Sequence, residues 1–246
     1  MSIRGEADKT VDRGIRAYNA VVRVLRRALR MRLPHAADAD IEDIRAKAAV
    51  GSDISSHLEP LFVEGLKRHP RVIVELGVRG GESTWVFERL ARRCGADLVS
   101  VDIVDCGKLS QYARWHFVQE DDVAFAGRFP RWCREAGVEP SIDVLFVDTS
   151  HKYDHTLAEI SAWFPHLSAR AVVMFHDTNI GTIFRRRDWT LGRGWDNDRG
   201  VVRALETVLG ISIAEGRSYE GDAGGWHITH DPVCNGLTVL RRTPTS

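Results

Sequence analysis

The sequence of 246 residues has no excess of charge of either sign, because 34 lysine and arginine residues balance 34 aspartate and glutamate residues. A balanced chain creates no global field toward nucleic acid or acidic lipid, so we expect neither as a partner. The chain also lacks a run of about 18 apolar residues, the length that a membrane-spanning helix needs. Its N-terminus lacks the apolar core and small-residue cleavage site of a signal peptide. We therefore expect a cytoplasmic protein without stable membrane insertion.

Cysteine is scarce, and the four cysteines are far apart, with no C-x-x-C pair. This spacing argues against a cysteine-rich zinc site and against a disulfide framework. Internal repeats and low-complexity segments are absent as well. A chain of this length with 43% hydrophobic residues can bury one large core, which favours a single α/β domain with an N-terminal extension.

Residues 1–69 form the predicted N-terminal helical extension. Over residues 11–33, apolar side chains recur at helical spacing among many arginines, which predicts a basic amphipathic helix. Two more helices are expected over residues 41–49 and 55–67. The first helix is expected to pack on the main domain or on another subunit, in preference to lying on a membrane surface. Packing on another subunit would give a homo-oligomer.

Residues 70–246 alternate short apolar strands with helical stretches, the pattern of a parallel sheet covered on both faces. The predicted fold is a Rossmann-like three-layer α/β sandwich, with a seven-stranded, mostly parallel sheet and a C-terminal antiparallel hairpin. Helices are expected over residues 82–93, 123–136, 153–166 and 200–209. Strands are expected over residues 72–76, 98–101, 115–118, 144–147, 172–175, 211–214 and 237–240.

A glycine-rich turn joins the first predicted strand to the helix that follows it. Gly77, Gly80 and Gly81 lie at this point, where backbone can approach a ligand closely and free N–H groups point outward. Asp102 ends the next strand, where an acidic side chain can accept hydrogen bonds from ribose hydroxyls. Each feature also has a purely structural explanation, because glycine permits tight turns and aspartate caps them.

The spacing of these glycines discriminates between nucleotide cofactors. The pattern G-x-x-G-G differs from the dinucleotide fingerprint G-x-G-x-x-G, and no G-K-[ST] follows that would make a Walker A loop. Glu75 precedes the first glycine. A carboxylate there would repel a pyrophosphate but would tolerate the cationic sulfonium and amino group of S-adenosylmethionine (SAM).

The segment Glu75-Leu76-Gly77-x-x-Gly80-Gly81 resembles the E-x-G-x-x-x-G first motif of class I SAM-dependent methyltransferases. The resemblance implies SAM as cofactor, with its ribose on Asp102. It places the stretch containing Glu120 and Asp121 near adenine, although both acids could instead cap the helix predicted from residue 123. The residues that it places beside the methionine part of SAM, all in the glycine turn, are Glu75, Gly77, Gly81 and Ser83.

Two polar groups follow neighbouring predicted strands, Asp148-x-x-His151-x-Tyr153 and Phe175-His176-Asp177. The carboxyl ends of such strands are where open α/β sheets place ligands and chemistry. Helix capping or backbone hydrogen bonding would be the structural explanation. Two polar clusters at the ends of two apolar strands make that explanation the weaker one, since burying them without a task costs stability.

Together these groups resemble the D-x-x-H-x-Y…HD signature of macrolide-sugar O-methyltransferases and of relatives of cephalosporin hydroxylase, over about half of the chain. The resemblance implies that His151 is the general base and that Asp148 and Asp177 bind Mg²⁺. Asp148 is also expected to face the cofactor. His176 stands where those enzymes have an acid, and a nitrogen ligand would favour another divalent metal. Tyr153 and His176 are assigned to the substrate side.

The segment between Thr178 and Gly200 mixes arginines with aromatic residues, including Trp189 and Trp195. Such a mixture suits stacking on a sugar or aromatic ring, although an oligomer contact or a solvated loop is an equal alternative. We expect an O-methyltransferase that acts on a small hydroxylated acceptor, such as a sugar of a natural product or glycolipid. A cephalosporin-hydroxylase-like enzyme and a non-catalytic SAM-binding or scaffold protein are the alternatives.

Overall fold

The computed structural model describes residue 17 and residues 38–180, 183–185, 189, 191–193 and 199–243. The predicted helix over residues 11–33 and the predicted oligomer contact lie outside the described residues, apart from Ala17, which is helical and exposed. In the described part of the chain, none of the helices has both the length and the apolar character required to cross a membrane.

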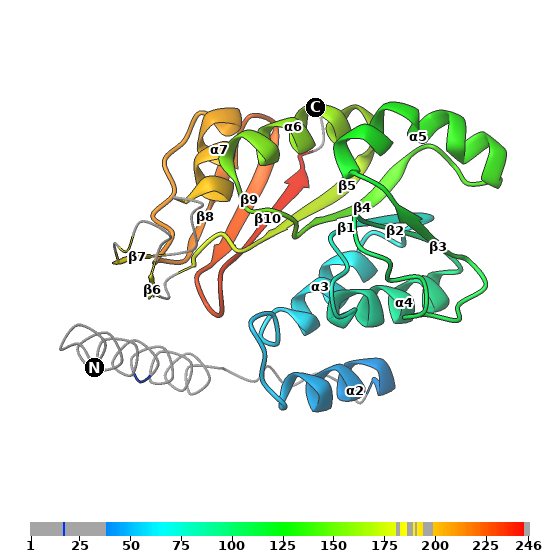
Figure 1. Cartoon of the computed structure of the whole chain (residues 1–246), viewed down its shortest axis with the longest axis horizontal. Coiled ribbons are helices and arrows are strands. Elements are labelled where there is room, and N and C mark those ends of the chain that lie inside the picture. The colour runs from blue at the N-terminus through cyan, green and yellow to red at the C-terminus, as the bar shows by residue number, and fades with distance from the viewer. Residues whose placement is uncertain are drawn as a thin grey trace, which may run out of the picture.

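One large sheet forms the centre of the molecule, and five parallel strands make its first part (Figure 1). The strands lie in the order β3-β2-β1-β4-β5. β1 and β4 are buried along their whole length, which accounts for their nearly unbroken apolar sequence. Their bounds are Val72–Leu76 for β1, Asp97–Asp102 for β2, Trp115–Gln119 for β3, Ile142–Val147 for β4 and Leu167–His176 for β5.

Three antiparallel strands complete the sheet beyond β5: β10 (Leu237–Arg242), β9 (Trp226–Asp231) and β8 (Tyr219–Ala223), in that order. The sheet therefore has eight strands and not the predicted seven. The prediction of a strand over residues 211–214 was wrong, because this segment has no regular structure and the hairpin partner of β10 is β9.

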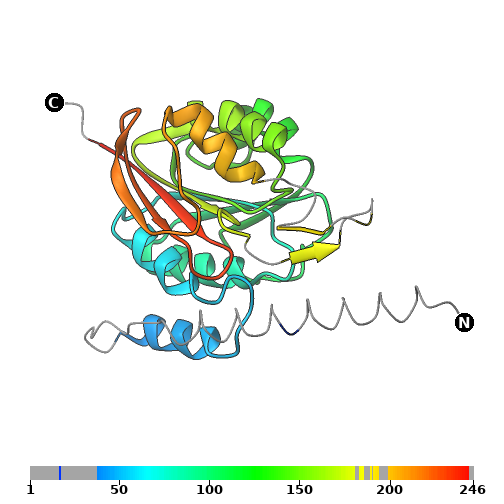
Figure 2. The same cartoon turned by 90° about the vertical axis from the view of Figure 1, so that its left-hand side faces the viewer.

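Helices cover both faces of the sheet, so the predicted three-layer sandwich is confirmed (Figures 1 and 2). α3 (Leu58–Leu66) and α4 (Glu82–Cys94) lie below it in Figure 1, and α2 (Ala39–Ala48) packs beneath α3. The other face carries α5 (Asp122–Ala136), α6 (Tyr153–Trp163) and α7 (Gly200–Leu209). Two short elements complete the list, the 3-10 turn η1 (Phe164–His166) and the small hairpin of β6 (Ile183–Arg185) and β7 (Leu191–Arg193).

Each face of the sheet has its own apolar core. Phe125, Phe129 and Trp163 are fully buried on the side of α5 and α6. Phe62 and Phe87 are fully buried on the other side, and Ile44 of α2 belongs to the same cluster. The described part of the N-terminal extension is thus packed into the core of the main domain. The rigid sheet holds the carboxyl ends of β1, β2, β4 and β5 at one edge, where the site lies.

Candidate active site

A cavity of about 580 Å³ opens at the carboxyl ends of the parallel strands. A volume of this size is typical of sites for cofactors and small ligands. Its wall consists of the turn after β1, the ends of β2, β4 and β5, and the beginnings of α5 and α6. The position agrees with the rule that open α/β sheets bind ligands beyond the carboxyl ends of their strands.

The wall of this cavity is strongly acidic although the whole chain is neutral. Arg79 is the one arginine on the wall within the described residues, and its guanidinium lies 3.1 Å from a carboxylate oxygen of Asp53. Such a wall attracts a cationic ligand and repels a pyrophosphate. Seven carboxylates line it: Asp53, Asp102, Glu120, Asp121, Asp122, Asp148 and Asp177.

Gly77 lets the turn after β1 approach the end of β4. Its φ of +86° is in the left-handed region, and a Cβ added there would lie 2.1 Å from the carbonyl oxygen of Asp148. Adjacent hydrogen bonds hold the two segments together, since the Asp148 amide donates to the carbonyl of Leu76 at 2.9 Å. A side chain at position 77 would therefore push Asp148 away from the wall.

Glu75 lies behind the glycine turn, with no exposed surface. Its carboxylate accepts hydrogen bonds from the hydroxyls of Ser83 at 2.6 Å, Ser100 at 2.7 Å and Thr84 at 2.8 Å. Burial raises the pKa of Glu75 to about 7, although the three hydroxyls act in the opposite direction. Three of the predicted cofactor residues, Glu75, Gly81 and Ser83, do not line the cavity. Glu75 and Ser83 support the turn from behind, and Gly81, with φ +75°, is the residue directly before α4.

Asp102 lies on the cavity wall, as predicted from its place at the end of β2. One carboxylate oxygen accepts from the amides of Val78 at 2.8 Å and Arg79 at 3.0 Å, and the other accepts from the amide of Val104 at 2.8 Å. The side chain therefore ties the glycine turn to the end of β2 and also caps the turn that follows. Each oxygen has two lone pairs, so a ligand hydroxyl can still be accepted.

Glu120 and Asp121 also lie on the wall, at the start of α5. The side chain of Asp121 accepts from the amide of Ala124 at 2.9 Å and thus caps the helix, the structural role considered above. Glu120 is paired with Arg128, and this guanidinium lowers the pKa of the carboxyl below its ordinary value. Both acids can still present charge to a ligand in the cavity.

His151, Asp148 and Asp177 come together from two loops, as the strand-end argument predicts. His151 Nε2 lies 3.0 Å from Asp177 Oδ2, and its Nδ1 lies 3.9 Å from Asp148 Oδ1. Burial alone would raise the pKa of Asp177, but His176 and His151 outweigh it and lower the value to about 2. Asp177 is therefore an ionised partner that fixes the imidazole of His151.

His176 is buried between the same two carboxylates. Its Nδ1 lies 3.3 Å from Asp177 Oδ1 and 3.5 Å from Asp148 Oδ1. Burial opposes the charged imidazole, yet the two carboxylates dominate and hold the pKa of His176 well above its ordinary value. The site thus has a positive charge next to two negative ones.

His57 is a site-related residue that sequence reasoning missed as a functional candidate. It has no exposed surface and contacts the ring of His176 edge-on, with centroids 5.2 Å apart. Burial and the neighbouring His176 hold the pKa of His57 well below its ordinary value. Its signal in the sequence was the segment Asp53-Ile54-x-x-His57-Leu58, where the resemblance to the methyltransferase subgroup begins. This segment reveals nothing about the long-range contact with β5.

The donor atoms of Asp148, His151 and Asp177 lie within 4.8 Å of one another, close enough to hold one metal ion. Two carboxylates with imidazole nitrogen suit a divalent transition metal. Mg²⁺ prefers oxygen ligands in octahedral geometry, so it fits this donor set less well.

The predicted substrate residues are scattered. Tyr153 faces α7, where its hydroxyl lies 3.2 Å from Thr207 Oγ1 and its ring lies under Arg203 at 4.7 Å. It is not among the described residues that line the cavity, whereas His176 is. The residue Trp189 is 68% exposed, and Trp195 lies outside the described residues.

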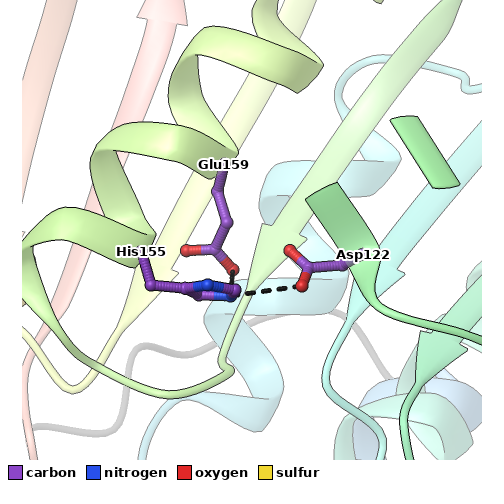
Figure 3. Close-up of side chains that lie close together, drawn as sticks. All are labelled: Asp122, His155 and Glu159. Atoms are coloured by element: carbon purple, nitrogen blue, oxygen red, sulfur yellow. Dashed lines mark ion pairs between the residues drawn. The ribbon is translucent and has the colours of Figure 1, made fainter. Parts of the chain in front are cut away.

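A second cluster of titratable side chains, two of which line the cavity, was not predicted (Figure 3). Nε2 of His155 lies 3.2 Å from Asp122 Oδ1 and 3.6 Å from Glu159 Oε1. Burial and then the charge of Asp122 raise the pKa of Glu159 to about 8, while Asp122 raises the pKa of His155. The sequence showed only that His155 and Glu159 are one turn apart on a helix.

Residues 74–178 match the model of a family described as a methyltransferase domain. The match begins within β1 and ends just after Asp177, so it covers the glycine turn and both strand-end groups. This part of the chain is therefore similar to a methyltransferase domain, in agreement with the predicted class of enzyme.

Similar proteins agree with this architecture. The protein y4gI of Sinorhizobium fredii is 33% identical over 130 residues, which are 45% of this chain but only 13% of that protein. A Corynebacterium glutamicum protein of known structure has a TM-score of 0.56 at 15% identity, covering 86% of this chain and 93% of its own. The MycE methyltransferase of the mycinamycin biosynthetic pathway, solved with Mg, SAH and mycinamycin VI, has a TM-score of 0.53 at 16% identity. That match covers 83% of this chain and 54% of MycE, and at these identities both structures show the shared fold alone.

Proposed function

We propose that this protein transfers a methyl group from SAM to a hydroxyl of a small acceptor, with His151 as the general base. The observation that carries the proposal is the acidic cavity at the strand ends of a methyltransferase domain. SAM carries a cationic sulfonium and an ammonium group, which the seven carboxylates of the wall attract. The same carboxylates repel the anionic pyrophosphate of NAD. The SAH bound in MycE supports the same cofactor class.

Within this cavity, we assign the ribose hydroxyls to Asp102 and the adenine end to the wall at Glu120 and Asp121. Gly77 permits the close approach of the first turn, and Asp148 faces the methionine end. Glu75 and Ser83 act behind this turn, because their hydrogen bond holds the beginning of α4 against β1. Gly81 supplies the left-handed start of that helix.

When bound, SAM supplies an electrophilic methyl group on a sulfonium. The methyl group would pass to the acceptor oxygen with SAH as the leaving group, and the role of His151 is to take the proton of that hydroxyl. Asp177 stabilises the imidazolium that results, since its carboxylate lies 3.0 Å from Nε2. Holding SAM and the acceptor together in one cavity lowers the activation barrier further, through proximity and orientation.

A divalent metal fits the same site, with Asp148 and Asp177 as ligands and an imidazole nitrogen beside them. Such an ion would lower the pKa of an acceptor hydroxyl and orient the oxygen. The donor set favours a transition metal ion over Mg²⁺. The nitrogen of this donor set belongs to His151, while His176, with its raised pKa, supplies a positive charge between the two carboxylates.

We infer that the acceptor is a hydroxylated metabolite such as a sugar of a natural product. Support comes from MycE, whose structure holds mycinamycin VI, and from the arginine-aromatic composition of the segment between β5 and α7. Trp189 belongs to this segment and is largely exposed, so it is available to stack on a ring.

The test is isothermal titration with SAM, SAH and NAD, followed by transfer of labelled methyl groups to a panel of sugars and macrolides. We expect micromolar binding of SAM and SAH and no binding of NAD. Binding of NAD instead of SAM would overturn the cofactor assignment. SAM binding without methyl transfer to any acceptor would favour a non-catalytic SAM-binding protein.

A further inference from the structure

The cluster of Asp122, His155 and Glu159 connects two helices on the same face of the sheet (Figure 3). Asp122 is the first residue of α5, and the other two lie on α6. Positions 155 and 159 are four apart in a helix, so their side chains project from the same face. The three side chains therefore converge from two directions on one point.

The distances in this cluster match those between ligands of one metal ion. Metal–ligand bonds of about 2.0–2.2 Å, at the angles of octahedral or tetrahedral coordination, separate neighbouring donors by about 2.8–3.6 Å. His155 Nε2 lies 3.2 Å from Asp122 Oδ1 and 3.6 Å from Glu159 Oε1. All three donor atoms lie within 4.8 Å of one another.

Both carboxylates have a buried oxygen without a hydrogen-bond partner among the described residues, Asp122 Oδ2 and Glu159 Oε2. The side chains are only 9% and 1% exposed. Figure 3 shows the second oxygen of Asp122 on the side that faces the Glu159 carboxylate. Two buried carboxylates that face each other repel when both are ionised, so either a cation or a shared proton must lie between them.

The surroundings supply the outer contacts and the access that a metal site needs. The hydroxyl of Thr149 donates to Glu159 Oε1 at 2.5 Å, the kind of hydrogen bond that orients a ligating carboxylate. Asp122 and His155 line the cavity, so an ion can enter from it. Thr149 follows Asp148 in the chain and links this cluster to the loop that carries His151.

We propose that Asp122, His155 and Glu159 bind a divalent transition metal ion, at a site separate from that of Asp148 and Asp177. One imidazole nitrogen with two carboxylates is a donor set for ions such as Zn²⁺ or Mn²⁺, not for Ca²⁺. The ion completes the contact between α5 and α6 and fixes Thr149, and thereby the loop of Asp148 and His151. The inference is independent of the methyl acceptor and of the cofactor.

The experiment titrates the full-length protein with ZnCl₂ by calorimetry and counts bound zinc by elemental analysis after dialysis. An Asp177→Asn variant is included to remove the other candidate site. We expect zinc at the cluster to persist in Asp177→Asn and to bind at least about 100-fold more weakly when His155→Gln is added.

His227→Gln is the matched control. His227 also lies near two carboxylates, Glu220 at 3.4 Å and Asp222 at 3.0 Å, but each of these side chains is 72% exposed. This variant should bind zinc like its parent. Equal zinc affinity with and without His155 would overturn the proposal and leave a proton shared between the carboxylates as the explanation.

A measurement on the unmutated protein decides the question if the His155 variant does not fold. Anomalous diffraction from zinc-soaked crystals should show a peak between Asp122, His155 and Glu159. Zinc peaks elsewhere with none at this position would overturn the proposal. SAM titration of the same samples reports on the proposed function separately, so a failure of one inference is distinguishable from a failure of the other.

Discussion

At the scale of single residues, three of the seven non-glycine residues with positive φ in the described part of the chain lie at the candidate active site. His151, Asp177 and Arg79 have φ values of +57°, +55° and +47°, which lie in the left-handed region that residues other than glycine rarely adopt. All three line the cavity. Such strain persists only where the surroundings hold the residue, and it is concentrated at functional sites. The contact between His151 and Asp177 connects two of these strained positions.

We expect His151→Ala to lower kcat by about 10²- to 10⁴-fold, the usual contribution of a general base, with SAM affinity nearly unchanged. The reason is that the imidazole is held by Asp177 for proton transfer and is not needed to place the cofactor. The measurement is initial-rate kinetics with titration calorimetry, and His227→Ala, on the surface hairpin, is the control. Full activity of His151→Ala would exclude this residue as the base.

Glu75 should make stability depend on pH in a defined direction. Its pKa is about 7 in the folded protein against an ordinary value of 4.5, so the folded state binds the proton more tightly. The stabilisation by the protonated form is complete below about pH 4.5 and is lost as the pH rises through 7. Its loss would amount to roughly 3 kcal/mol across this window, at 1.36 kcal/mol per pKa unit.

Urea denaturation of the wild type and of Glu75→Gln at several pH values between about 5 and 8 tests this. The free energy of unfolding of the wild type should fall relative to that of the variant as the pH rises. A difference between the two proteins that does not change with pH would show that Glu75 does not titrate in this range.

Residues at strand ends were predictable, and residues on helix faces were not. The rule that parallel strands end at one edge of their sheet is sufficient to bring Asp148, His151 and Asp177 together from the sequence alone. His155 was visible only as one residue of an amphipathic helix, because its partner Asp122 depends on which helices are neighbours. That choice is made by packing over the whole sheet and leaves no local trace in the sequence.

At the scale of elements, the turn after β1 depends on one of its glycines. We expect Gly77→Ala to lower stability by more than about 1 kcal/mol, because φ is +86° and the new Cβ would meet the Asp148 carbonyl at 2.1 Å. Gly80→Ala is the matched control, since a Cβ at that position has open space and should change stability by less than about 0.5 kcal/mol.

Thermal unfolding and SAM titration of both variants check this expectation. Gly77→Ala should also weaken SAM binding, because the displaced Asp148 belongs to the cavity wall. Equal effects of the two substitutions would contradict the role assigned to Gly77.

The strands of the parallel half were predictable, whereas in the antiparallel half β10 was predicted and β8 and β9 were not. β1 and β4 are apolar runs bounded by turns. Such a run can be recognised as a strand from its own sequence, without knowledge of the strand it pairs with. β8 has the sequence Tyr-Glu-Gly-Asp-Ala, which has low strand propensity and becomes a strand by pairing with β9 at the edge of the sheet. The segment 211–214 contains two β-branched isoleucines, yet it does not enter the sheet.

At the scale of the whole molecule, charge is balanced in sum and separated in space. Lysine and arginine equal aspartate and glutamate at 34 each, yet the cavity wall presents seven carboxylates. The net charge of the composition therefore could not reveal the local field of the cavity. A field confined to a cavity acts on the ligand that enters it and leaves encounters elsewhere on the surface nearly unaffected.

This separation predicts how salt changes ligand binding. SAM carries one positive charge more than SAH, so its affinity should depend more on the acidic wall. Raising the salt concentration from about 0.05 M to about 0.5 M shortens the Debye length from about 14 Å to about 4 Å and should weaken SAM binding roughly three- to tenfold. SAH binding should change less.

A charge-neutralising variant separates the field from direct contacts. Asp121→Asn removes one wall charge, while asparagine still caps α5 as aspartate does. Any contact of residue 121 with the shared adenosine part affects SAM and SAH alike, so the ratio of their dissociation constants isolates the charge effect. We expect this ratio to shift against SAM in the variant and at high salt. A ratio that stays constant in both cases would mean that contacts and not the field select the cofactor, and the acidity of the wall would then belong to the acceptor or to the metal.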